Sequence, residues 1–262
     1  MSFIGNSKIA ARVHVYDAEL RDRITELEAE VEIAYADGQK AEHDAFWDAY
    51  QDGGNRTNYQ YAFSGSGWSI DNFKPKFDIL PTRCDYAFSQ NDNMPDVDFS
   101  NLLKSLGVLL DTSNTSNINY MFMYCRFKRV PEIRTERTTS LAYTFSNSLI
   151  ETVDKIVLRS EGNQSFNNTF QKCERLKNIQ FEGKIGESIN FQSCPLTTDS
   201  MINIINHLKN FYNDPDNRNT RTLTFSEACW AALAERDEEC PLYLDMGWGW
   251  RDMVAYDSMW NT

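Results

Sequence analysis

At 262 residues, with 41% hydrophobic and 13% aromatic residues, the chain is long enough to bury a sizeable core and too aromatic for a disordered protein. Its net charge of −12 argues against a nucleic-acid backbone or an anionic membrane surface as a partner, because both select basic proteins. The sequence has no run of 18 apolar residues, and its first residues lack the basic and apolar regions of a secretory signal, so we expect neither membrane insertion nor secretion through such a signal.

Residues 1–54 are predicted to form an N-terminal arm followed by a helical or coiled-coil stalk. Apolar residues recur there at heptad spacing, while glutamate and arginine cover the outer positions. Two interpretations stay open, an amphipathic helix that lies on its own domain and a parallel stalk that forms a homo-oligomer. The candidates for oligomerisation are Leu20, Ile24, Leu27 and Val31.

Residues 55–196 contain an internal repeat marked by phenylalanines. In its clearest copy, Leu176, Ile179 and Phe181 follow Phe170 in steps that suit a helical turn leading into a strand. The intervals between the phenylalanines are mostly twenty-odd residues, and a longer one holds a predicted helix and polar turn at 100–117. The residues expected in the repeat core are Phe63, Phe88, Phe122, Phe145, Phe170, Leu176, Ile179, Phe181 and Phe191.

One such repeat cannot bury its own apolar face, so stacking of the copies is expected. The predicted fold class is α+β, a short leucine-rich-repeat-like solenoid with an N-terminal coiled-coil or helical segment and a C-terminal α/β cap. Residues 197–262 are assigned to this capping region. Within it, the pattern predicts a helix over 200–212, a strand over 221–225 and a second helix that Ser226 caps at its N-terminus.

Motifs for chemistry are scarce in the sequence. The three histidines have no metal-ligand spacing, and the six cysteines form no C-x-x-C pair, so buried free thiols are expected. Asp96 and Asp98 could mimic the carboxylate pair of a glycosidase, but an acidic chain offers many such coincidences. We therefore predict no enzyme, no catalytic residues, no metal site and no cofactor. The ligand-binding residues are not identified by the sequence.

The pattern Phe-x-x-Cys-x-x-Leu-x-x-Ile-x-Phe at 170–181 resembles the BspA-type leucine-rich repeat. Tyr-Ala-Phe at 86–88, Tyr-Met-Phe at 120–122 and Tyr-Thr-Phe at 143–145 are similar to another element of that repeat. Residues 46–68 resemble the beginning of repeat proteins encoded by phages and prophages of gut Firmicutes.

These resemblances imply a non-enzymatic phage virion protein, a tail or fibre appendage that serves host-surface recognition or structural attachment. Its implied partners are a protein or glycan on a host cell surface and other virion proteins. An alternative is a BspA-like adhesin on a bacterial cell surface, and a more remote one is a carbohydrate-active enzyme.

Overall fold

The computed structural model describes residues 58–65, 67–71, 73–75, 78–211, 216, 221–235 and 249–250, together with Arg23, Glu26 and Leu27. The chain divides into two compact units, 1–54 and 55–262. In the first unit the three described residues are helical, and the Arg23 guanidinium lies 2.9 Å from the Glu26 carboxylate. None of the described helices has both the length and the apolar character that a membrane crossing requires.

The second unit is a series of stacked turns joined by backbone hydrogen bonds. The N–H groups of Phe122 and Tyr124 donate to the carbonyls of Thr144 and Ser146 in the next turn, at 2.8 and 3.0 Å. Similar bonds join the turn before and the turn after. Because every second N–H bonds the following turn, neighbouring turns are held about one strand spacing apart.

Six phenylalanine rings form a column through the interior of these turns. Neighbouring rings are stacked, with centroids 4.6–5.7 Å apart and planes inclined by 3–24°. The rings belong to Phe63, Phe88, Phe122, Phe145, Phe170 and Phe191. Phe225 continues the column at a tilt, 5.9 Å from Phe191, so the interior is continuous into the C-terminal part of the unit.

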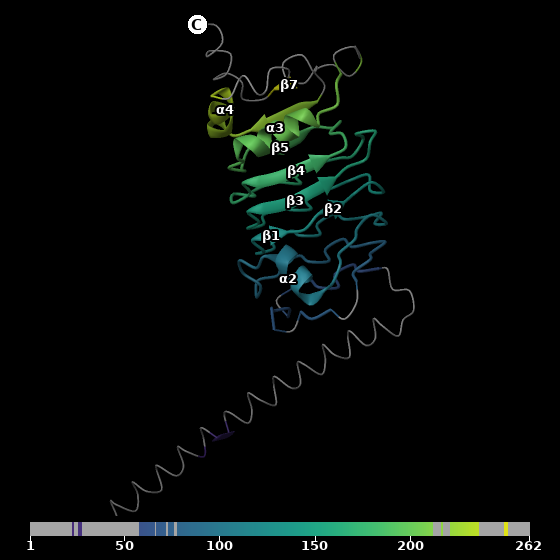
Figure 1. Cartoon of the computed structure of the whole chain (residues 1–262), viewed down its shortest axis with the longest axis vertical. Helices are drawn as coiled ribbons and strands as arrows, with labels where there is room; N and C mark the ends of the chain where they lie inside the picture. The colour runs from purple at the N-terminus through teal and green to yellow at the C-terminus, as the bar shows by residue number, and fades with distance from the viewer. Residues whose placement is uncertain are drawn as a thin grey trace, which may run out of the picture. The chain divides into compact units, whose positions relative to one another are not determined.

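The strands are short and parallel, and they form two sheets (Figure 1). In the four-stranded sheet, β3 pairs with β1, β2 and β4, with a register shift between Val153 and Ile156. The other sheet has the order β5-β6-β7. The bounds are β1 Arg129–Val130, β2 Ile133–Arg134, β3 Thr152–Val157, β4 Asn178–Glu182, β5 Ile189–Phe191, β6 Thr222–Phe225 and β7 Gly249–Trp250.

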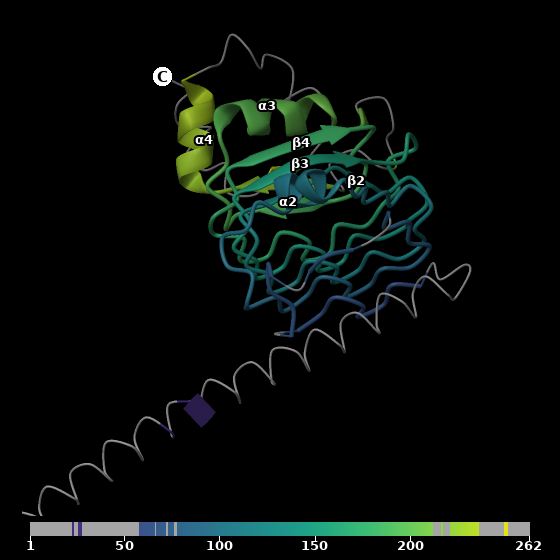
Figure 2. The same ribbon diagram turned by 60° about the horizontal axis from the view of Figure 1, so that its bottom comes forward.

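Three short helices accompany the sheets, α2 (Phe99–Leu106), α3 (Thr198–Asn206) and α4 (Glu227–Ala234). The longer phenylalanine interval holds α2, and the C-terminal segments hold α3, β6 and α4, as the sequence predicts for each of these elements. Ser226 accepts a hydrogen bond from the Cys229 N–H, so its predicted N-cap is also confirmed. Helix α3 lies beside β4, and α4 lies beside α3 (Figure 2).

The predicted fold class is wrong. In place of a leucine-rich-repeat-like solenoid with an α/β cap, the described residues form three short helices and a few short strands in two small sheets, with no solenoid closure. The first turns contribute only isolated bridges, such as Asn58 with Arg83 and Ile79 with Leu110. Unequal intervals and the α2 insertion prevent a constant register, so much of the turn-to-turn bonding falls on irregular backbone. What remains is a weakly α+β fold.

Replacing Phe170 with alanine tests the importance of the phenylalanine column. The ring is stacked on Phe145 and Phe191, so its loss opens a cavity between two layers. We expect the free energy of unfolding to fall by about 3–5 kcal/mol, measured by urea denaturation. Leu80→Ala is the control, because Leu80 is 49% exposed and its truncation should cost about 0.5 kcal/mol or less. If the free energy of unfolding fell equally in the two variants, the stability of the protein would not depend on the phenylalanine column.

Candidate functional site

A column of tyrosines lies on the outside of the stacked turns. Each tyrosine stands two residues before a buried phenylalanine and has a left-handed backbone, with φ between 56° and 63°. The four residues are Tyr61, Tyr86, Tyr120 and Tyr143. A left-handed conformation is costly for a residue with a side chain, so its recurrence in four turns marks a position that the stacked geometry imposes.

The tyrosine rings are stacked on one another almost in parallel. Neighbouring centroids are 4.5–5.1 Å apart and the planes differ by 4–13°. Asn168 takes the next position, also left-handed at φ 51°, and its Nδ2 donates to the Tyr143 hydroxyl at 2.8 Å. The column therefore ends in an amide that fixes the last ring.

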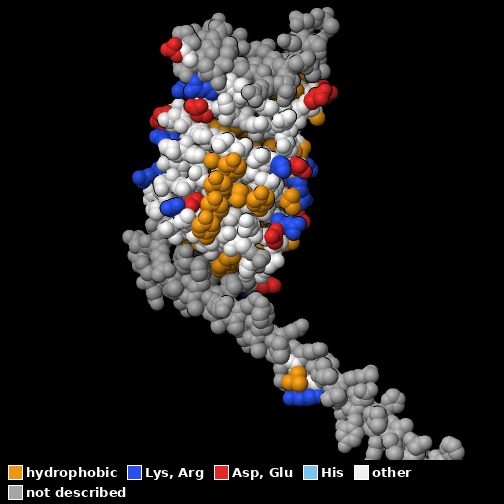
Figure 3. All heavy atoms as spheres, turned by 180° about the vertical axis from the view of Figure 1, so that it is seen from behind, with side chains coloured by type: hydrophobic (Ala, Val, Ile, Leu, Met, Phe, Trp, Pro, Cys, Tyr) orange, Lys and Arg blue, Asp and Glu red, His pale blue; other side chains and the backbone are white. Residues whose placement is uncertain are grey.

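The column presents ring edges and hydroxyl groups to solvent, because the ring faces cover one another. Tyr61 is 55% exposed, and the other three are half-buried. Partial burial, with the neighbouring Tyr120 and Tyr61 as lesser causes, raises the pKa of the Tyr86 hydroxyl. Figure 3 colours tyrosine together with the hydrophobic side chains, and side chains of this class gather in a narrow stripe on one face of this unit.

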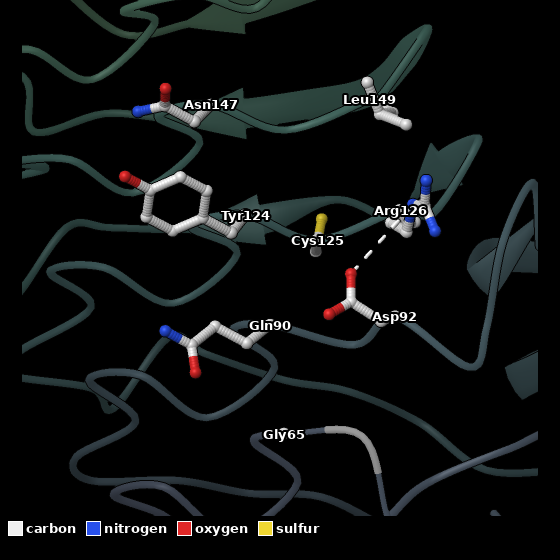
Figure 4. Close-up of a pocket in the computed structure, with 8 residues that line it drawn as sticks. All are labelled: Gly65, Gln90, Asp92, Tyr124, Cys125, Arg126, Asn147 and Leu149. Atoms are coloured by element: carbon white, nitrogen blue, oxygen red, sulfur yellow. Dashed lines mark ion pairs between the residues drawn. The ribbon is translucent and has the colours of Figure 1, made fainter.

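A hollow of ≈ 800 Å³ adjoins the turns that carry the column (Figure 4). Three of its side chains, Gln90, Tyr124 and Asn147, stand two residues after a buried phenylalanine and are again left-handed, with φ of 56–57°. They come from successive turns and lie one above another along the same side of the hollow (Figure 4). Gly65 holds the corresponding position in the first turn, with φ 91°.

Other residues give the hollow limited charge. The Arg126 guanidinium and the Asp92 carboxylate form an exposed ion pair at 4.0 Å, and Leu149 adds an apolar side chain. Asp92 is the one carboxylate among the lining residues, so the hollow lacks the two carboxylates that glycoside hydrolysis commonly uses.

The thiol that borders this hollow is unsuited to act as a nucleophile. Cys125 is buried, and burial raises the pKa of its thiol far above the ordinary range. Nucleophilic attack requires the thiolate, which burial in apolar surroundings disfavours. Cys84 is held in the same way, and all five described cysteines are buried and free, which confirms the sequence-based expectation for them. Cys240 lies outside the described residues.

Asp96 and Asp98, the carboxylate pair considered from the sequence, have structural partners. Asp96 forms an ion pair with Arg175 at 3.0 Å. Asp98 caps α2, because its carboxylate accepts hydrogen bonds from the Asn101 N–H and side-chain amide at 2.9 and 2.8 Å. In the part of the chain that the structure describes, no group of three His, Cys, Asp or Glu side chains could hold a metal ion.

The residues that the sequence assigns to the repeat core lie in the interior of the second unit and not on this surface. All nine expected repeat-core residues are at most 2% exposed, from Phe63 to Phe191, and none lines the hollow. Leu27 is helical and 44% exposed, whereas Leu20, Ile24 and Val31 lie outside the described residues. Sequence reasoning missed the tyrosine column, although its signal was present in the recurrent Tyr-x-Phe motif.

Comparison of the chain with protein-family models, with curated proteins and with solved structures finds no match. The resemblance to BspA-type and phage-encoded repeat proteins therefore stays a prediction from the sequence.

Thiol labelling tests whether any described cysteine is reactive. The Cys240→Ser variant leaves the five buried thiols, and we expect none of them to react with a chromogenic disulfide reagent within minutes in the native protein. All five should react at once in guanidinium chloride. Rapid reaction of one thiol in the native variant would instead identify an accessible cysteine and reopen a chemical role for it.

Proposed function

We propose that this chain is a non-enzymatic binding protein of a phage virion, a tail or fibre appendage that contacts the host cell surface through its tyrosine column. The observation that carries the proposal is the row of four stacked, partly exposed tyrosines. Exposed aromatic groups on a soluble chain are typical of interaction sites, and tyrosine is enriched in them.

The column is well suited to binding because its side chains are ordered before a partner arrives. Each inner ring is stacked on both sides, and Asn168 holds the hydroxyl of the last one. A contact with such a surface loses little side-chain entropy, so a larger part of the contact energy remains as affinity. The adjoining hollow adds amides that can donate and accept hydrogen bonds.

The N-terminal unit supports a second part of the proposal, attachment or oligomerisation. Leu27 is exposed on a helix in the single chain, as a residue that packs against a partner helix would be. Several copies on one particle would convert weak contacts into strong attachment to a cell.

A bacterial cell-surface adhesin is the alternative, since the same surface would serve both settings. Genes for tail or capsid proteins beside this gene, and the chain itself in purified virions, would favour the phage setting. A wall anchor in the full gene would favour the adhesin. A carbohydrate-active enzyme is the more remote alternative, because the hollow beside the column has one carboxylate rather than two.

Loss of two tyrosines should weaken cell binding. In the double variant Tyr86→Asn, Tyr120→Asn, asparagine suits the left-handed backbone, and Asn168 already occupies the equivalent position in the turn after that of Tyr143. We expect about a tenfold or greater loss of binding of the labelled protein to cells of the bacterium whose genome or prophage encodes it. Leu109→Asn, which removes another exposed apolar side chain, is the control and should bind normally. Undiminished binding by the tyrosine variant would contradict the proposed surface.

The stalk hypothesis has a separate test on the full-length chain. We expect the wild-type protein to sediment as an oligomer and Leu27→Lys to shift it toward the monomer, because a charge is unfavourable in an apolar helix seam. Glu26→Gln is the control and should leave the mass unchanged, since Glu26 is exposed. A monomeric wild-type protein would show that oligomerisation through this helix is wrong.

A further inference from the structure

A second hollow of ≈ 570 Å³ lies beside β5 and β6, next to the segment that follows the buried Gln164. Four amides and five hydroxyl side chains line it, together with one carboxylate and two apolar residues. The amides are those of Asn163, Asn167, Asn168 and Asn190, and the carboxylate is that of Glu187. Neutral donors and acceptors in this number match a ligand that is itself rich in hydroxyl groups.

Several of the polar groups are available to a ligand. The side chains of Asn163 and Asn167 are exposed and form no hydrogen bond with any described residue. Others are already used within the wall, since Ser188 Oγ accepts from the Thr222 N–H at 3.0 Å and Asn190 Oδ1 accepts from the Gln192 N–H at 2.8 Å. The free amides are therefore the groups that would select a ligand.

The wall that carries these amides is held from inside. Gln164 is 1% exposed, and its Nε2 donates to the carbonyl oxygens of Thr135 and Thr138 at 2.7 and 3.1 Å. Its Oε1 accepts from the Arg159 N–H at 2.8 Å. With the Gln164 side chain fixed inward, the exposed side chains of Asn163 and Ser165 on either side of it line the hollow.

A close approach of two glycines fixes the neighbouring loops. A Cβ added to Gly186 would lie 1.9 Å from the Gly162 carbonyl oxygen, so only glycine fits there. Gly162 precedes Asn163, and Gly186 precedes Glu187, so this contact joins the two sides of the hollow.

The hollow begins where the tyrosine column ends. Asn168 lines it and also donates to the Tyr143 hydroxyl. Tyr143 does not itself line the hollow, so the column and the hollow meet at Asn168. A ligand that spans both would contact aromatic ring edges on one side and amides and hydroxyls on the other, and a sugar presents both apolar C–H groups and hydroxyls.

Charge restricts the ligand further. Glu187 is the one ionisable residue among those that line the hollow, and it is paired with Arg221 at 3.3 Å. The chain as a whole carries −12. An acidic polymer would meet repulsion without an unpaired cation in the hollow to offset it.

We propose that this hollow binds a neutral oligosaccharide, such as a glycan of the host cell surface. The inference rests on the proposed function and gives it a ligand class: the tyrosine column would contact the glycan layer, and the hollow would select its neutral sugars.

The test measures binding of small soluble sugars to the full-length protein. The probes are neutral trisaccharides of glucose, galactose and N-acetylglucosamine, with trigalacturonic acid as the acidic comparison, followed by ligand-observed NMR or calorimetry. We expect at least one neutral trisaccharide to bind and the acidic one not to bind. In the double variant Asn163→Ala, Asn167→Ala, the affinity should fall about tenfold, because two hydrogen bonds are lost. Gln180→Ala removes an exposed amide from β4, outside the hollow, and should bind as the wild type does.

Cell binding separates this inference from the proposed function. If the protein binds cells but no neutral trisaccharide, or if the double variant binds its sugar normally, the hollow is not a saccharide site although the surface function stands. Preference for trigalacturonic acid would also overturn the inference. If a neutral sugar binds in the hollow while the protein ignores the cells, the saccharide site is supported and the proposed host-surface function fails.

Discussion

The spacing between successive turns is the constraint on which the rest of this structure depends. Backbone N–H groups of one turn bond carbonyls of the next, and this fixes the distance between turns at about 4.7–4.9 Å. A flat aromatic ring fills that distance when it lies parallel to its neighbours. The interior phenylalanines therefore stack at 4.6–5.7 Å, and the exterior tyrosines, which belong to the same turns, stack at 4.5–5.1 Å. The binding surface that we propose is thus a direct consequence of core geometry.

Left-handed residues are the means by which each turn places one aromatic ring inside and another outside. Among the residues that the structure describes, ten other than glycine have positive φ, nearly all at the positions two before or two after a buried phenylalanine. Each such residue carries a conformational cost of about 1–2 kcal/mol. The stacked turns tolerate this cost because they bond one another through backbone groups and share a continuous aromatic core. Asparagine and glycine ease it at some positions, as in Asn147 and Gly65.

The buried residues could be predicted from the sequence, whereas the arrangement of the strands could not. Phe88 and Phe170 could be recognised from spacing alone, because apolar residues follow both at the same offsets. The helices α2, α3 and α4 could be predicted from apolar periodicity and capping residues such as Ser226. The solenoid prediction failed because periodicity says which residues are buried but does not say whether strands keep a common register. The register depends on the bulge between Val153 and Ile156, which no local pattern reveals, and on how the α2 insertion offsets the turns on either side of it.

The surface was harder to predict for a different physical reason. From the sequence, a tyrosine two residues before a buried phenylalanine could point into the core or toward solvent. The left-handed backbone at Tyr86 and Tyr120 directs their side chains outward. Asn163 and Asn167 are ordinary polar residues in the sequence, and they become notable when Gln164 is seen fixed inward beside them.

Two positions in each turn differ in how much their side chains vary, and this suggests separate contributions to the affinity and the selectivity of binding. Tyrosine recurs two residues before the phenylalanine, whereas the position two residues after it holds Gly65, Gln90, Tyr124 and Asn147 in successive turns. The residue two before the phenylalanine must stack on its neighbours in every turn, so the fold favours tyrosine there. The residue two after the phenylalanine does not have to stack, and its side chain can vary as long as the residue tolerates a left-handed backbone. A partner that lies along the stack would therefore gain general contact from the tyrosines, and it would be distinguished by the amides beside them and by the polar hollow at the end of the column.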